Sequence, residues 1–487
     1  MKRRQFIILS ASTVGAVFLT RCASGQSNAQ FASPQNYASK DGLLDVSLGA
    51  NYGPVSLGGQ QANLLNYNGQ VPGPLLEARP GDTVRIRFTN NLPQATNLHY
   101  HGLHISPTGT ADNVFLKVPS GETFNYEFAI PNNHPAGTFW YHPHLHGLVA
   151  DQVAGGLAGL LVVRGELDDI PEVAAAKEQF LVLQDFELTG GELVTPNPME
   201  RMTGREGSLV TVNGGVNPSL SVPAGGLLRL RLLNASVSRF YRLSLEEHPF
   251  YLIATDGGAV ERPLELKEIL LTPGERVEVL VRGDREPGQY RLLNLPYDRG
   301  GMMMGGGMMG GGMMGGGMMG SRTGRGSATE VLATLNYSDR ASTPLPLPEK
   351  LLPVEKLPEP KRVRSFLLNH GMAPGMGMVF LINGRMFEHD RVDTSVELNE
   401  VEDWELTNNG VMDHPFHLHV NHFQVISRTG ILPVTPEGSW KDTVLVKTGE
   451  TVRVRVPFRD FVGKTVYHCH ILDHEDLGMM GSLEIKS

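Results

Sequence analysis

Residues 467–479 read Tyr-His-Cys-His-Ile-Leu-Asp-His-Glu-Asp-Leu-Gly-Met. On a β-strand successive side chains point to opposite faces, so Cys469 points one way while His468 and His470 both point the other. His474 and Met479 follow at steps of five, from a loop that can fold back toward the cysteine. Two histidines, a cysteine and a weak axial methionine are the ligands of a blue-copper electron-transfer site. The segment therefore predicts two copper sites on one strand, and the second histidine of the first site must come from elsewhere.

Three further histidine clusters can supply the missing ligands. Each contains a His-x-His pair, and on an extended strand both imidazoles of such a pair face the same way. The clusters are His99-Tyr100-His101-Gly102, His142-Pro143-His144 and His414-Pro415-Phe416-His417-Leu418-His419. His414 lies three residues before His417, out of step with that pair, and is free to join Cys469. A single His-x-His motif is weak evidence for a metal site. Four such motifs, one with a central cysteine, are not explained as histidines of the hydrophobic core.

These clusters resemble the four copper-binding motifs of the multicopper oxidases, H-x-H-G, H-x-H, H-P-x-H-x-H and H-C-H-x-x-x-H-x-x-x-x-M. The resemblance extends from about Tyr67 to the C-terminus. It implies an all-β fold of three consecutive cupredoxin-like Greek-key β-sandwich domains, of which the first and last supply the ligands. Two short motifs are weaker signals of the family, because proline and glycine at such positions are common in turns of any protein. They are Val71-Pro72-Gly73-Pro74 and Pro273-Gly274-Glu275-Arg276.

The resemblance also implies four copper ions and assigns ligands to each. The type 1 copper would take His414, Cys469, His474 and Met479. The type 2 copper would take His99 and His417. The two type 3 coppers would take His101, His142, His144, His419, His468 and His470. The trinuclear centre formed by the last two groups would lie between the first and third domains.

Composition and charge agree with a large β protein. The 487 residues leave room for about three domains, and 57 glycines and 32 prolines leave little scope for long helices. Segments such as Thr83–Thr89, Leu228–Leu233 and Thr451–Val456 alternate apolar and polar residues, which predicts half-buried strands of sandwiches. The net charge of −9 offers no basic face for nucleic acid.

The N-terminal 30 residues resemble an export signal of the twin-arginine type. Lys2, Arg3 and Arg4 precede an apolar run, Phe6 to Leu19, that is too short to span a membrane. An ordinary secretory signal is the alternative, and Cys22 stands where a lipoprotein cysteine could. We expect a periplasmic or exported protein with no stable membrane insertion. Cleavage near Ala23 or Ala29 would leave a polar leader of low structure up to about Ser39.

The clusters suggest domain boundaries. The first domain is predicted at residues 40–166, ending with a strand at Gly159–Arg164, and the second at 167–340. The third, at 341–487, begins with a proline-rich linker from Thr343 to Pro360.

The second predicted domain carries an unusual insertion. Residues 301–320 are only glycine and methionine. The tract is placed on a hairpin between strands at Gln289–Leu295 and Thr329–Asn336. It is either a flexible loop or a Cu(I)-recruiting segment, because thioether sulfur is a soft ligand that prefers Cu(I). Its nine methionines are Met302, Met303, Met304, Met308, Met309, Met313, Met314, Met318 and Met319; Met372, Met376, Met378 and Met412 are further candidates.

The resemblance implies a function. The chain would couple one-electron oxidation of Cu(I), phenols or both to reduction of O₂ to water, with a role in copper tolerance. Cys469 would carry electrons, and Glu475 and Asp112 would pass protons. The alternatives are a laccase without a copper-tolerance role and a periplasmic copper-buffering protein. We expect a monomer.

Overall fold

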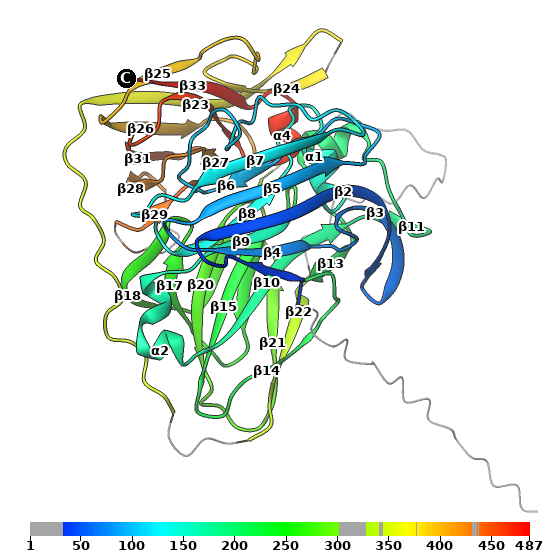
Figure 1. Cartoon of the computed structure of the whole chain (residues 1–487), viewed down its shortest axis with the longest axis vertical. Coiled ribbons are helices and arrows are strands. Elements are labelled where there is room, and N and C mark those ends of the chain that lie inside the picture. The colour runs from blue at the N-terminus through cyan, green and yellow to red at the C-terminus, as the bar shows by residue number, and fades with distance from the viewer. Residues whose placement is uncertain (1–32, 301–327, 340–343, 376, 431–435, 437) are drawn as a thin grey trace, which may run out of the picture.

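The computed structural model describes residues 33–300, 328–339, 344–375, 377–430, 436 and 438–487. Their regular structure is almost entirely β, in six sheets that form three two-sheet sandwiches (Figure 1). The predicted all-β fold is therefore confirmed. No helix within these ranges is long and apolar enough to cross a membrane.

The first sandwich is built mainly from residues before 164. Its five-stranded sheet has the order β1 (Asn36–Ala38), β4 (Gly73–Ala78), β9 (Gly159–Val163), β8 (Gly137–His142), β6 (His99–His101). Its six-stranded sheet has the order β11 (Leu188–Thr189), β12 (Glu192–Leu193), β3 (Gln60–Tyr67), β2 (Leu43–Leu57), β5 (Thr83–Asn90), β7 (Thr123–Ala129). The two sheets enclose a core that includes Phe88, Tyr100 and Phe139.

The second sandwich follows in the chain. One sheet has the order β13 (Leu209–Val212), β10 (Lys177–Phe186), β15 (Leu227–Asn234), β20 (Arg276–Arg282), β17 (Phe250–Thr255), β18 (Gly258–Leu266). The other has the order β14 (Ser219–Ser221), β22 (Glu330–Tyr337), β21 (Gly288–Leu295), β16 (Tyr241–Leu245), β19 (Glu268–Leu271). Strands β21 and β22 pair antiparallel from Gly288↔Tyr337 to Asn294↔Glu330, which confirms the predicted hairpin. The Gly/Met tract between them lies outside the described residues.

The third sandwich contains the C-terminal strands. One sheet has the order β24 (Gly377–Ile382), β23 (Arg362–Ala373), β26 (Val401–Asn408), β31 (Thr451–Pro457), β28 (Phe423–Arg428), β29 (Trp440–Lys441). The other has the order β25 (Thr394–Glu397), β33 (Met480–Lys486), β32 (Gly463–Cys469), β27 (His414–Leu418), β30 (Thr443–Val446). The described part of the proline-rich linker runs along the outside of the molecule to β23 (Figure 1).

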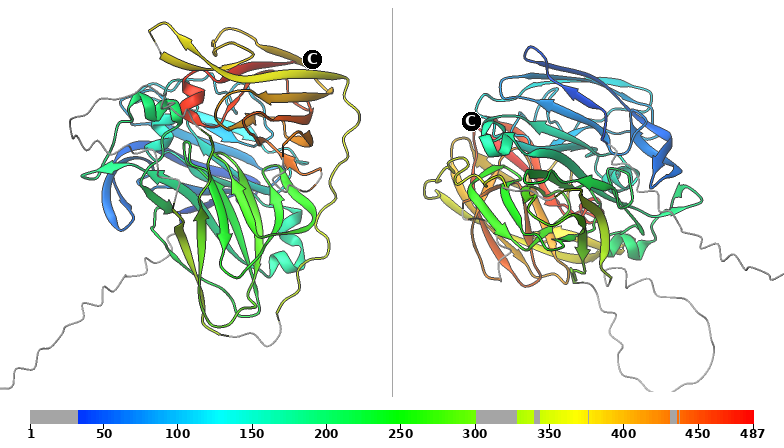
Figure 2. Two further views of the ribbon diagram at one scale, coloured as in Figure 1. Left: turned by 180° about the vertical axis from the view of Figure 1, so that it is seen from behind. Right: turned by 90° about the horizontal axis from the view of Figure 1, so that it is seen from below.

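Five short helices connect the strands of the described residues. They are α1 (Val149–Ala154), a 3₁₀ helix at Glu166–Asp169, α2 (Pro171–Ala174), α3 (Pro198–Thr203) and α4 (Leu472–Asp476). The first and third sandwiches lie side by side, and the second packs against both (Figure 2). The histidine-bearing strands β6, β8, β27 and β32 therefore meet near the junction of all three.

Two local expectations are wrong. Strand β15 was predicted to be half-buried, but all eight of its residues are buried. The charged side chains Arg229 and Arg231 are enclosed because ion pairs with Glu278 and other carboxylates neutralise them. The leader was predicted to have little structure up to Ser39, yet Asn36–Ala38 form β1, which pairs parallel with β4. Residues 1–32, with the predicted export signal and Cys22, lie outside the described residues.

The buried Arg231 network gives a stability prediction. Arg231 is fully enclosed and contacts Asp168, Glu178 and Glu278. Arg231→Ala should lower the free energy of unfolding by about 3–5 kcal/mol, because it leaves buried carboxylates without their partner. Urea denaturation of the copper-free protein measures the loss.

The control is Arg85→Ala. Arg85 pairs with Glu127 at the surface, with side chains 50% and 53% exposed, so its removal should cost at most about 1 kcal/mol. Equal losses in both variants would contradict the account of the buried network.

Candidate metal centres

The first centre, here called the cysteine cluster, consists of His414, Cys469, His474 and Met479. Cys469 Sγ lies 3.4 Å from His414 Nδ1 and 3.9 Å from His474 Nδ1, and the two Nδ1 atoms are 3.3 Å apart. All four residues are buried, and Cys469 N donates to the carbonyl oxygen of Met479 (3.0 Å). His474 lies on helix α4 and not in the predicted loop. That helix turns its imidazole back toward the end of β32.

The chemistry of the cysteine cluster suits a metal ion. Burial lowers the pKa of His414 to about 3 and the pKa of His474 well below its usual range. Burial also raises the pKa of the Cys469 thiol. The two imidazoles are therefore neutral, and their Nδ1 atoms face each other and the sulfur of Cys469. Imidazole nitrogen with thiolate sulfur is a copper donor set.

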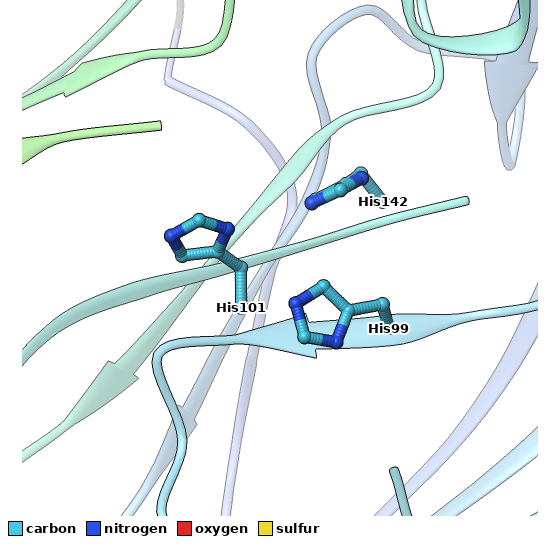
Figure 3. A group of neighbouring side chains, drawn as sticks. All are labelled: His99, His101 and His142. Atoms are coloured by element: carbon cyan, nitrogen blue, oxygen red, sulfur yellow. The ribbon is translucent and has the colours of Figure 1, made fainter. Parts of the chain in front are cut away.

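The second centre, here called the histidine cluster, contains the eight histidines of the four His-x-His pairs. Figure 3 shows three of them, with His99 and His101 on β6 and His142 at the end of β8. Rings of the first and third sandwiches interleave: His99 stacks on His419 at 3.9 Å between centroids, and His101 on His417 at 3.8 Å. His468 Nε2 lies 3.1 Å from His144 Nε2. The structure thus brings together the eight residues that the sequence predicted.

The outward-facing nitrogen of several of these rings has a hydrogen-bond partner. The Nδ1 atoms of His142, His417 and His468 donate to backbone carbonyl oxygens at 2.8–2.9 Å. Such bonds fix the tautomer and leave a lone pair on the other nitrogen. Several buried ring nitrogens of the cluster have no hydrogen-bond partner among the described residues: His99 Nε2, His101 Nδ1, His142 Nε2, His417 Nε2, His419 Nδ1 and both nitrogens of His470.

Buried, unpartnered nitrogens are costly unless a ligand satisfies them. Burial lowers the pKa of His142 to about 3 and keeps His99 and His468 neutral as well. Neutral imidazole lone pairs around one space bind divalent transition metals such as copper. The residues present therefore fit a cluster of copper ions.

The two predicted proton-passing carboxylates lie against the histidine cluster. Asp112 Oδ1 accepts from His99 Nδ1 (2.8 Å), and burial raises the pKa of Asp112 to about 8, opposed by a hydrogen bond from Tyr100 N. Glu475 lies within 3.8 Å of His144 Nδ1 and 3.6 Å of His468 Nδ1. Burial raises the pKa of Glu475 well above its usual range. Neither is a solvated surface carboxylate.

Sequence reasoning missed a third carboxylate, Asp442. Its Oδ1 lies 3.1 Å from His101 Nε2 and 3.4 Å from His417 Nδ1. The residue is 1% exposed and stands between β29 and β30, where Thr443 pairs with His417. A lone acid directly before the apolar run Thr443–Val446 was the available signal in the sequence.

The candidate methionines of the third sandwich have different environments. Met378 and Met412 are buried in its core, whereas Met372 is 77% exposed. Met376 and the nine methionines of the Gly/Met tract lie outside the described residues. The chain that enters the tract is anchored, because Gly300 forms a bridge with Met412 and Asp413 N donates to Arg299 O. Gly300, the last described residue before the tract, therefore pairs with a residue two positions before His414.

Comparison with known proteins agrees with this geometry. Three models of the multicopper oxidases match residues 50–168, 182–303 and 357–487. The multicopper oxidase mco of Staphylococcus haemolyticus is 31% identical, over 88% of this chain and 85% of that protein. A solved multicopper oxidase from Campylobacter jejuni, called a metallo-oxidase, has a TM-score of 0.78 and 31% identity, covering 93% of this chain and 96% of that one. The chain belongs to the multicopper oxidase family.

The family fixes the domain type and the cofactor in general terms. The three β-sandwiches are cupredoxin domains, and copper is the cofactor. Another relative, the cell division protein FtsP of Xenorhabdus nematophila, is 28% identical over 100% of this chain and 99% of that protein.

The cysteine cluster gives a spectroscopic prediction. Cys469→Ser should abolish the intense blue colour of the copper-loaded protein, because a serine oxygen does not replace the soft thiolate. The histidine cluster loses no ligand and should still bind copper. Visible absorption and copper analysis of the purified variant measure both effects. A variant that stays blue would show that Cys469 is not the ligand.

Proposed function

We propose that this protein is a multicopper oxidase that couples one-electron oxidation of Cu(I) or a phenol to four-electron reduction of O₂ to water. One observation carries the proposal. The tripeptide His468–Cys469–His470 contributes its sulfur to one buried cluster and its two imidazoles to the other. A copper-buffering protein needs no such connection between two sites.

Four copper ions have a matching set of ligands in this arrangement. The type 1 ion would be held by His414, Cys469, His474 and Met479 of the cysteine cluster. Within the histidine cluster, His99 and His417 would hold the type 2 ion, and the other six would hold the type 3 pair. Bound copper would supply one-electron redox chemistry and the affinity for O₂.

Access to the histidine cluster supports O₂ as the acceptor. A cavity of about 320 Å³ reaches His144 and is lined by Val114, Phe115, His389 and Met480, among others. His389 is exposed, so the cavity connects the surface with a predicted type 3 ligand. Its apolar lining suits a small apolar molecule such as O₂.

Glu475 is placed to supply protons to the same site. Its two oxygens have no hydrogen-bond partner among the described residues, and they face His144 and His468. A buried carboxyl with a raised pKa holds its proton at neutral pH and can release it when charge develops nearby. Asp112, on the far side of His99, is the second candidate.

The surroundings of His414 support an external electron donor. His414 Nε2 lies beside Gly410, where a Cβ would stand 3.7 Å from that nitrogen. Gly300, directly before the Gly/Met tract, pairs with Met412, two residues before His414. The soft thioether sulfurs of the tract would favour Cu(I) as the electron donor, and with it a role in copper tolerance. Export by the twin-arginine signal would place this activity in the periplasm.

Oxygen uptake tests the proposal directly. The copper-loaded protein should consume one O₂ for every four molecules of Cu(I) or of a one-electron phenol donor. An oxygen electrode with measured donor additions gives this ratio. Tight copper binding without oxygen consumption would identify a buffering protein, and turnover of phenol alone would identify a laccase without a copper-tolerance role.

The proposed proton path gives a kinetic prediction. Glu475→Gln keeps the shape of the side chain but removes its acidic proton, so O₂ reduction should slow about 10- to 100-fold. Anaerobic stopped-flow reduction of the blue centre should stay nearly unchanged. Equal slowing of both steps would point instead to a disturbed cysteine cluster, since His474 is the neighbour of Glu475.

The Gly/Met tract gives a prediction about substrate preference. Deletion of residues 301–320 should raise KM for Cu(I) while turnover of a bulky phenol stays equal or improves, because none of the twelve predicted ligands is removed. A second variant that replaces the nine methionines by leucine keeps the length and the apolar bulk, and should lose Cu(I) preference in the same way. The measurement is the ratio of kcat/KM for Cu(I) to that for the phenol. An unchanged ratio in both variants would show that the tract is only a flexible loop.

A further inference from the structure

A turn of the second sandwich reaches the histidine cluster, although that sandwich supplies no predicted ligand. Arg276 ends this turn, Pro273–Arg276, and begins β20. Its guanidinium donates to both oxygens of Asp442, from Nη1 to Oδ1 at 2.8 Å and from Nη2 to Oδ2 at 2.6 Å. Its Nε donates to the carbonyl oxygen of Thr138 in β8 (2.9 Å). One side chain therefore joins all three sandwiches.

Asp442 connects Arg276 to two of the predicted copper ligands. Its Oδ1 accepts from His101 Nε2 at 3.1 Å. His417 Nδ1 donates to the backbone carbonyl oxygen of Asp442 at 2.9 Å and lies 3.4 Å from Oδ1, and the two rings stack on each other. Both oxygens of Asp442 accept from Arg276, and Oδ1 also lies against the two imidazoles. An accepting carboxylate at His101 Nε2 requires the proton on that atom, which leaves the lone pair of Nδ1 directed into the cluster.

The close packing around this pair explains two glycines. Gly102 has a φ of +84°, and a Cβ there would lie 2.3 Å from Arg276 Nη2 and 2.6 Å from Asp442 Oδ2. Gly274 has a φ of +83°, and a Cβ there would lie 2.7 Å from Cδ2 of His470. The final glycine of the H-x-H-G motif thus makes room for the ion pair, and the turn itself is in contact with a third histidine.

The ion pair belongs to a larger network of charged residues. Lys441, next to Asp442, pairs with Asp256 Oδ2 and Glu275 Oε1, both at 2.9 Å. Asp442 is 1% exposed and keeps Arg276 as its counter-ion through the two hydrogen bonds. The planar guanidinium donates to both carboxylate oxygens at once and thereby fixes the orientation of the carboxylate. A lysine ammonium lacks this planar geometry.

We infer that Arg276 is a positioning residue of the histidine cluster, acting through Asp442 on His101 and His417. The inference rests on the proposed function, because it takes the histidine cluster to be the copper site. The second sandwich then does more than separate the other two. It sets the direction of two imidazoles that belong to them.

Arg276→Lys tests this role, because lysine keeps the positive charge but cannot form the bidentate hydrogen bond with Asp442. After dialysis against a copper chelator, the variant should hold the non-blue copper about 10- to 100-fold more weakly than wild type. The electron paramagnetic resonance signal of the remaining non-blue copper should change its hyperfine splitting. The blue absorption should be unchanged, because the cysteine cluster contains none of these groups. Asp442→Asn should weaken the binding of non-blue copper in the same way. It replaces Arg276→Lys in the test if that variant does not fold.

Arg231→Lys is the matched control. Arg231 is as buried as Arg276 and also pairs with carboxylates, but its partners Asp168, Glu178 and Glu278 form no described ion pair with a predicted ligand. It should lower the melting temperature and leave copper content and both spectra at wild-type values. If Arg276→Lys and Asp442→Asn also keep wild-type copper and spectra, the inference is overturned. If wild type itself binds no non-blue copper, the proposed function fails instead.

Discussion

The alternation of side chains along β32 is the constraint on which the rest of the structure depends. Because Cys469 and its two neighbours point to opposite faces, one strand has to end between two buried clusters. The first cluster then requires His414 from β27 and His474 from α4, and the second requires the other three His-x-His pairs. The sheets that carry these residues must meet there, which brings the first and third sandwiches together.

Burial of so many imidazoles creates a second requirement. Each ring needs a fixed tautomer, so that its lone pair points inward and its N–H points to an acceptor. Backbone carbonyl oxygens meet this need for His142 and His468, and carboxylates meet it for His99 and His101. Buried carboxylates in turn need partners, and the second sandwich provides one for Asp442 through Arg276. The polar contacts around the cluster thus involve all three sandwiches.

The sequence predicted what depends on short-range periodicity. The all-β fold, strands such as β5 and β31, and the convergence of the eight histidines follow from alternation over a few residues. Contacts between distant segments were not predictable in this way. Asp442 and Arg276 are 166 residues apart, and only folding brings them together. The same holds for the ion pairs that allow β15 to be buried. Strand β1 and helix α4 were missed because tertiary contacts, and not local pattern, stabilise such short elements.

The central claim is that two copper centres share the tripeptide 468–470. Anomalous diffraction at the copper absorption edge, from crystals of the copper-loaded protein, tests it most directly. The account predicts four peaks, one among His414, Cys469 and His474 and three among the eight histidines. A histidine cluster without anomalous density, next to an occupied cysteine cluster, would contradict it.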